Sequence, residues 1–166
     1  MAEALIHNNS IRKVDLSDNK IDDEGFYAYE KIPLVNYCLE KFNISKNTIS
    51  DDSAKNFLKN LAKNTVFKGL NFFDNQLKNE AGSQIIEVLR NNKNLTKINL
   101  KFNRIQLRIL EEINRLIKYN IEQYKLKFIP NIQRQISSNR VEPAFFVQAN
   151  EKIQETNINK KFVYNC

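Results

Sequence analysis

The sequence is poor in the residues that build disulfide, metal and turn-rich frameworks. Its 166 residues include two cysteines, one histidine, three glycines, three prolines and no tryptophan. Cys38 and Cys166 stand far apart and form no Cys-x-x-Cys motif, so neither a disulfide framework nor a zinc site is expected. The scarcity of Gly and Pro argues against a turn-rich β-sandwich. We therefore predict a protein of the reducing cytoplasm that holds no metal and no cofactor.

Catalytic signatures are missing as well. The chain has no Gly-rich phosphate loop, no nucleophilic Ser elbow and no Cys/His pair at a workable spacing. Adjacent carboxylates, such as Asp51 and Asp52, fit helix starts or exposed helix faces better than an acid–base site. We therefore predict that the chain is not an enzyme.

Long apolar runs and concentrated charge are also absent. No run approaches the roughly 18 apolar residues of a membrane-spanning helix, and the N-terminus lacks the apolar core of a signal peptide. Lys and Arg outnumber Asp and Glu by 26 to 19, which gives a net charge of +7. Because no basic run is interleaved with aromatic residues, we expect neither specific nucleic-acid binding nor membrane binding. The net positive charge allows a mild preference for acidic partner surfaces.

What the sequence does contain is a repeat with a period of 28 residues. Four asparagines mark it: Asn19, Asn47, Asn75 and Asn103. The positions eight, five and three residues before each Asn, and two residues after it, are apolar in all four repeats. These positions are Ile11, Leu39, Phe67 and Leu95; Val14, Phe42, Leu70 and Ile98; Leu16, Ile44, Phe72 and Leu100; and Ile21, Ile49, Leu77 and Ile105.

Each repeat predicts one short strand followed by a helical segment. The apolar residues five and three before the Asn alternate with polar ones, as in a strand with one buried face. The Asn lies among core positions, so we expect its amide to bond backbone groups of neighbouring repeats and form a ladder. Helical spacing follows, for example at Ala54, Phe57, Leu58 and Leu61.

The pattern Leu-x-x-Leu-x-Leu-x-x-Asn-x-Leu with this period resembles the leucine-rich repeat, in its ribonuclease-inhibitor-like subtype. Residues 11–21 are the first instance, and three more follow. The resemblance implies an α/β solenoid with a short parallel sheet on the concave side and helices on the convex side. We assign residues 1–105 to the repeats, with four repeat strands preceded by the end of a partial repeat.

The chain opens inside a repeat. Residues 3–10 align without a gap on residues 87–94, so residues 3–8 are expected to end a helix whose strand is missing. An uncapped parallel strand offers an open hydrogen-bonding edge. We expect the N-terminal edge to be continued by missing sequence or covered by a partner.

The fourth repeat changes character after its strand. Ile109 stands where earlier repeats carry a small residue, and residues 106–128 form a long helix without a breaker, which is expected to cap the solenoid. Residues 129–166, rich in Asn and Gln, are expected to form an extended arm. One stripe of the helix is apolar: Leu107, Leu110, Asn114, Ile117, Ile121, Tyr124 and Phe128, widened by Ile109, Ile113 and Leu116.

Outward-facing positions are the candidate partner-binding sites. Phe73 and Phe102 are apolar where solvent is expected, and aromatic anchors dominate interface energetics. The alternative is that the lysines are solvated and that the apolar residues pack within the chain. The concave-face candidates are Lys13, Lys41, Asn43, Asn71, Phe73, Lys97, Asn99, Lys101 and Phe102. The candidates on the helix and arm are Ile121, Tyr124, Phe128, Phe145 and Phe146.

Together these features predict a non-catalytic protein–protein interaction scaffold that assembles with other protein subunits of a larger complex. Repeat length and the appended helix are similar to ciliary and flagellar leucine-rich-repeat proteins, including the leucine-rich-repeat subunit of the nexin–dynein regulatory complex. That similarity implies a cytoplasmic, cytoskeletal location in a cilium or axoneme. The alternative is a regulator of a small GTPase, similar to Ran GTPase-activating proteins, or an actin-regulatory leucine-rich-repeat protein.

Overall fold

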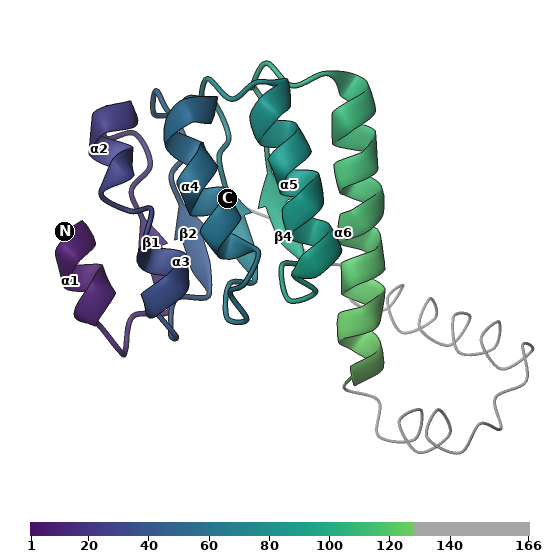
Figure 1. Ribbon diagram of the computed structural model, residues 1–166, viewed down its shortest axis with the longest axis horizontal. Coiled ribbons are helices and arrows are strands. Elements are labelled where there is room, and N and C mark those ends of the chain that lie inside the picture. Colours follow the sequence, from purple (N-terminus) through teal and green to yellow (C-terminus); the bar gives the residue numbers. More distant parts are fainter. Residues whose placement is uncertain (128–166) are drawn as a thin grey trace, which may run out of the picture. The chain divides into compact units, whose positions relative to one another are not determined.

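A computed structural model of the chain describes residues 1–127, and Met1–Lys125 form one compact unit. Short strands alternate with helices along this unit (Figure 1). The predicted extended arm lies outside the described residues. The elements are α1 (Ala2–His7), β1 (Lys13–Asp15), α2 (Asp23–Tyr27), α3 (Ile32–Val35), β2 (Lys41–Asn43), α4 (Asp51–Leu61), β3 (Gly69–Asn71), α5 (Asn79–Asn91), β4 (Lys97–Asn99) and α6 (Leu107–Lys127).

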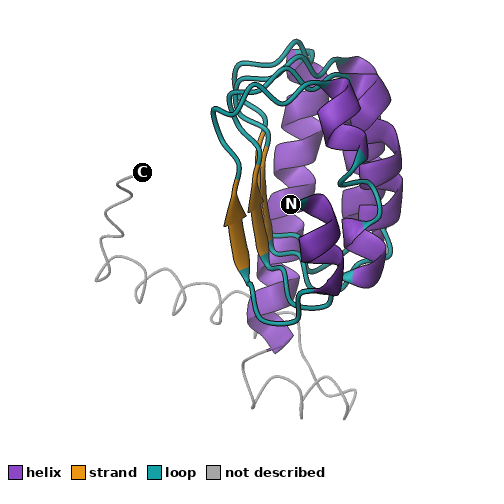
Figure 2. Ribbon diagram, turned by 90° about the vertical axis from the view of Figure 1, so that its left-hand side faces the viewer, coloured by secondary structure: helices purple, strands orange, loops and turns teal. Residues whose placement is uncertain are grey.

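The four strands form one parallel sheet in chain order, β1-β2-β3-β4. Their register follows the sequence period, since the middle residues Val14, Phe42, Leu70 and Ile98 lie opposite one another. Within residues 1–127 the helices cover one face of the sheet, and we call the other face the open face (Figure 2). The α/β architecture expected from the repeat is therefore confirmed, together with the long C-terminal helix.

The core between sheet and helices is unusually aromatic. Phe26, Phe42, Phe57, Phe67 and Phe72 are all at most 1% exposed, and each belongs to a different strand, turn or helix. Their rings contact one another, with centroids 5.4 Å apart for Phe26 and Phe57 and 5.8 Å apart for Phe42 and Phe57. Phenylalanine thus fills positions where the repeat pattern asks only for an apolar residue, and its rings bridge adjacent coils.

The predicted asparagine ladder is present. The Asn47 Nδ2 donates to the Leu16 carbonyl of the preceding coil (3.1 Å) and to two carbonyls of its own coil. Its Oδ1 accepts from the N–H groups of Asn19 (3.2 Å) and Ile21 (2.8 Å). Asn75 repeats the arrangement one coil further along. Each amide therefore satisfies the backbone of two coils at once.

The first complete coil departs from the others because its helical segment is broken into α2 and α3. Pro33 lies in the first turn of α3. Proline lacks an N–H, and its ring clashes with the carbonyl four residues earlier, so a helix that began at Asp23 cannot run through it. The equivalent segment of the next coil has no proline and forms the continuous helix α4.

Helix α6 buries the side of the predicted stripe that carries Ile109, Ile113 and Leu116, together with Asn120, and leaves other predicted positions exposed. Its buried residues are Ile109, Ile113, Leu116 and Asn120, whereas Leu107 is 70% exposed. Ile109 is accommodated because Gly82 of α5 leaves room for it: a Cβ built on Gly82 would lie only 2.7 Å from the Ile109 Cγ2.

Among the helices of residues 1–127, none combines the length and the apolar character that crossing a bilayer requires.

Candidate functional site

The sheet register brings the predicted lysines together on the open face. Lys13, Lys41 and Lys97 are exposed and share one column across the strands, with Gly69 between the last two. Gly69 is buried, and a Cβ there would lie 3.5 Å from the Lys41 Cγ and 3.9 Å from the Lys97 Cβ. The stems of these two lysines therefore flank the glycine, and their charges belong to one continuous strip of the open face.

The predicted asparagines occupy the next column of the open face, where they are half-buried and have a structural role. The Oδ1 atoms of Asn43, Asn71 and Asn99 accept from the N–H two residues further on, at 3.2, 3.0 and 3.2 Å. These local bonds turn the chain out of each strand. Asp15 holds the same position in the first coil, and its pKa is lowered by hydrogen bonds from the side chain and backbone of Ser17 and from Asn43. This column is polar and partly occupied by internal hydrogen bonds.

The predicted aromatic residues form a pair. The rings of Phe73 and Phe102 lie in an edge-to-face arrangement with centroids 5.0 Å apart. Phe73 is half-buried, and Phe102 is 73% exposed. Lys101 is exposed beside Phe102. The structure thus places an aromatic pair next to basic residues at the end of the sheet formed by the last two strands.

Phe102 also has a strained backbone. Its φ of 58° is left-handed, as are the φ values at the equivalent positions of the other coils, Asp18, Lys46 and Asp74. Asp tolerates this conformation comparatively well, whereas a bulky aromatic residue there is uncommon. The turn itself requires the left-handed residue, and the first three coils show that it does not require an aromatic one.

Two of the predicted helix residues lie in the described part of α6. Ile121 and Tyr124 of α6 are half-buried. Phe128, Phe145 and Phe146 lie outside the described residues.

A second asparagine ladder was missed in the sequence, although it has the same period. Asn36, Asn64 and Asn92 are at most 5% exposed, and each donates through Nδ2 to the carbonyl 31 residues earlier, at 2.7 to 2.9 Å. Each Oδ1 accepts from the N–H groups two and three residues later. The signal was available in the sequence, because Asn8, Asn36, Asn64, Asn92 and Asn120 are spaced by 28 residues.

Charged residues also bridge neighbouring coils. Glu40 contacts Arg12 of the preceding coil (2.9 Å) and Lys68 of the following coil (3.0 Å). The hydrogen bond from Lys68, reinforced by Arg12, lowers the pKa of the Glu40 carboxyl. These charges therefore pair with each other between three successive coils.

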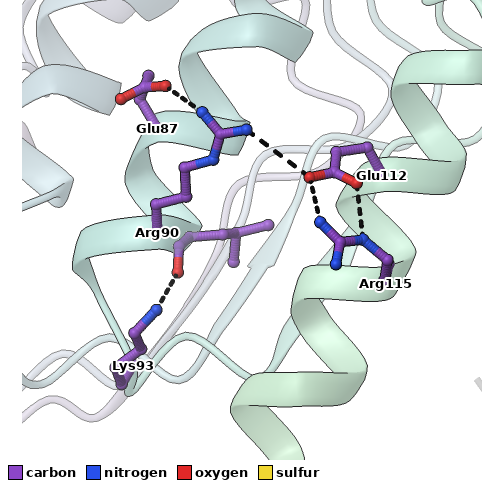
Figure 3. A network of polar contacts seen from close by, with 6 residues as sticks. Glu87, Arg90, Lys93, Glu112 and Arg115 are labelled. Atoms are coloured by element: carbon purple, nitrogen blue, oxygen red, sulfur yellow. Dashed lines mark hydrogen bonds and ion pairs between the residues drawn. The ribbon is translucent and has the colours of Figure 1, made fainter.

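A second ionic network links α5 to α6 on the helical side (Figure 3). Arg115 makes two hydrogen bonds to the Glu112 carboxylate, at 2.8 and 2.7 Å, and lowers its pKa. Arg90 pairs with Glu87 at 2.9 Å and approaches Glu112 to 3.8 Å. Lys93 lies over the Tyr119 ring, 5.2 Å from its centroid. These contacts fix α6 against the last coil.

The lowered pKa values all belong to such bridging groups. Asp15, Asp23, Glu40 and Glu112 are held by hydrogen bonds or ion pairs within or between coils. Within residues 1–127, no three His, Cys, Asp or Glu side chains are grouped closely enough to hold a metal ion.

Comparison with known proteins agrees with this architecture. A model described as "Leucine Rich repeat" matches residues 7–28, 35–58 and 91–113, so leucine-rich repeats are present in this chain. No curated protein matches the sequence. Among solved structures, "Leiomodin-1 Actin-Binding Site 2 (ABS2)" is similar at a TM-score of 0.69 and 19% identity, covering 82% of this chain and 78% of that one. The tropomodulin C-terminal domain of Caenorhabditis elegans is similar at 0.53 and 14% identity, covering 76% and 96%.

The leucine-rich-repeat fold is thus established, and its rigid stack of coils suits a protein-interaction scaffold. Neither the ribonuclease-inhibitor-like subtype nor a ciliary identity appears in these comparisons.

Proposed function

We propose that this chain is a non-catalytic scaffold of the cytoskeleton that binds a protein partner through the open face, at Phe73 and Phe102 and the lysines beside them. The observation that carries the proposal is Phe102, which is 73% exposed in a left-handed conformation with a φ of 58°. Such a conformation costs an L-amino acid roughly 1–2 kcal/mol. Strained residues of this kind concentrate at functional sites. Aromatic side chains are also the commonest anchors of protein interfaces.

The surroundings of Phe102 favour a partner with an acidic rim. Lys101 is exposed next to Phe102 in the chain, and Lys13, Lys41 and Lys97 form the basic strip on the strands of the same face. The chain as a whole carries a net charge of +7. Complementary charge around an aromatic anchor speeds association and sets the register of the partner.

Actin is the partner to test first. The similar solved structure of leiomodin-1 is that of its actin-binding site 2. An actin-regulatory protein is also one of the alternatives that the sequence leaves open. The ciliary or axonemal assembly and the small-GTPase regulator stay as predictions, and nothing in residues 1–127 favours either of them over actin.

The experiment measures binding of the full chain to monomeric and filamentous actin, for the natural sequence and for Phe102→Asn. Asparagine tolerates the left-handed turn, so this variant removes the anchor while preserving the backbone. Asp74→Asn makes the same replacement at the equivalent position one coil earlier and serves as the matched control. We expect Phe102→Asn to weaken binding by about tenfold or more, and Asp74→Asn to leave it unchanged.

Two results would contradict the proposal in different ways. Equal binding by both variants would show that the aromatic pair is not the anchor. The chain could instead fail to bind actin and capture tubulin or dynein-complex subunits, with Phe102→Asn abolishing that capture. This result would support the binding site at Phe102 and show that its partner is axonemal rather than actin.

A further inference from the structure

The first complete coil exposes apolar residues on its helical side. Leu34 and Val35 lie in α3 and are 42% and 40% exposed, and Tyr37, just after this helix, is 72% exposed. Tyr27, at the end of α2, is 45% exposed. Both helices lie near the N-terminal end of the stack (Figure 1). Large apolar side chains that are exposed together mark interaction surfaces.

The repeat shows that the fold does not need apolar residues at these four positions. Of the residues that hold the same positions in the next two coils, Ala62 alone is apolar, and it is half-buried. The equivalent residues are Lys55, Ala62, Lys63 and Thr65 in the second coil, and Ser83, Arg90, Asn91 and Lys93 in the third. Because those coils complete the same architecture with polar side chains, core packing does not explain the apolar ones of the first coil.

Two lysines of the second coil lie beside the apolar patch, which we define as Leu34, Val35 and Tyr37. The Asn64 Nδ2 donates to the Pro33 carbonyl (2.7 Å), directly before Leu34 in the chain. Lys63 precedes Asn64, and Lys59 lies one turn earlier on α4. Both lysines are exposed. Val35 and Lys63 hold equivalent positions of successive coils, so their side chains leave the stack on the same side.

These lysines have no counter-charge in the described part of the chain. Lys31, at the N-terminal cap of α3, is exposed as well. Within residues 1–127, the ammonium groups of Lys31, Lys59 and Lys63 form no ion pair. The carboxylate of Glu30, next to Lys31, instead accepts from the Asn56 Nδ2 (2.9 Å). Three uncompensated positive charges therefore border the patch.

We propose that the apolar patch and its lysine border are the docking site for an acidic peptide segment of a partner protein. The patch holds the apolar anchors of the segment, and the lysines face carboxylates on both sides of them. Charge complementarity selects this occupant, because a neutral or basic segment would leave the three lysines without counter-charges at the interface. The site lies on the helical side of the sheet, so it is separate from the open face (Figure 2).

Selection from a random peptide library displayed on phage tests the occupant. The library is first depleted on a patch variant of the full chain, which combines Leu34→Ala, Val35→Asn and Tyr37→Thr, and is then selected on the natural chain. Each replacement is the residue found at the same position of a later coil, so the variant should keep its fold and its melting temperature. We expect the selected peptides to combine apolar residues with an excess of Asp and Glu.

The consensus peptide is then titrated against variants of the full chain by fluorescence anisotropy. The double variant Lys59→Glu and Lys63→Glu should weaken binding by about tenfold or more, as should the patch variant. The double variant Lys13→Glu and Lys41→Glu makes the same charge change on the open face and is the matched control. Leu107→Ala removes an apolar side chain that is 70% exposed outside the patch. Both controls should leave the affinity unchanged.

Three results would overturn the proposal. The first is that no acidic peptide is enriched, or that the enriched peptides bind the patch variant as tightly as the natural chain. The second is binding to phosphatidylserine vesicles that the patch variant loses, without any enriched peptide, because the occupant would then be a lipid surface. The third is a dimer of the natural chain that the patch variant dissociates in analytical ultracentrifugation, because a second copy would then cover the patch.

Discussion

Replacing Asn47 with alanine tests whether the asparagine ladder holds the coils together. The Asn47 side chain is 7% exposed and makes five hydrogen bonds, including one to the Leu16 carbonyl and two from the N–H groups of Asn19 and Ile21. Each buried group left without a partner costs about 1–3 kcal/mol. Water reaches part of this set, because Asn19 is exposed and Ile21 is half-buried. We therefore expect a loss of about 3–5 kcal/mol of unfolding free energy, well under the additive limit.

Asn19→Ala is the matched control, because Asn19 holds the same repeat position at the exposed end of the sheet. Its side chain makes one hydrogen bond, from Nδ2 to the Ser17 carbonyl (2.8 Å), and its removal should cost about 1 kcal/mol or less. Urea unfolding followed by circular dichroism at 222 nm measures both variants. Equal losses, or a loss below about 1 kcal/mol for Asn47→Ala, would refute the assignment of the ladder as the main polar tie between coils.

Two further perturbations follow from particular contacts. Gly82→Ala should lower the melting temperature, because the new Cβ would lie 2.7 Å from Ile109 and 2.9 Å from Ile105. This clash should outweigh the higher helix propensity of alanine, which favours the variant by roughly 1 kcal/mol. A higher melting temperature of the variant would contradict the close packing of α5 on α6. Asp23 is partly buried, which raises its pKa, but hydrogen bonds from Ser50 and Ser53 outweigh burial and lower it. A carboxyl whose folded pKa lies below the unfolded value near 3.9 stabilises the fold above about pH 4, and this contribution is lost as the pH falls through the folded pKa. Asp23→Asn should therefore show a smaller loss of unfolding free energy between pH 7 and pH 3 than the natural chain, and an unchanged pH dependence would contradict this role.

The period alone predicted the sheet, its register and the first ladder, because one amide and four apolar positions recur in every coil. It did not predict the bridging role of Asp23, Asp51 and Asn79. Their side chains accept from the backbone N–H 27 residues later, at 2.8, 2.6 and 2.8 Å. The sequence analysis assigned Asp51 to a helix start, where negative charge is favourable without any contact to another coil. Because such a residue already fits its own helix start, its hydrogen bond to the next coil cannot be recognised from the sequence alone.

The long helix shows the opposite difficulty. Its apolar spacing predicted a wide stripe, of which Leu107 and Asn114 are exposed. The buried face runs through the predicted Ile109 and Ile113 and through Asn120, which was not predicted. Ile109 stands at a repeat position that is small in the three earlier repeats. The space it needs comes from Gly82 on the neighbouring helix. Which face of a helix is buried depends on the partner surface, and a single sequence does not display that surface.

Function in such a stack belongs to the positions that depart from the repeat. The ladders and the apolar core are the same in every coil, so they explain rigidity and cannot distinguish one ligand from another. Two departures lie at the C-terminal end: Phe102 replaces Asp or Lys at a left-handed turn, and α6 runs past the Asn that should end it. We therefore expect Phe102→Asn to weaken partner binding while leaving the ladders and the apolar core unchanged.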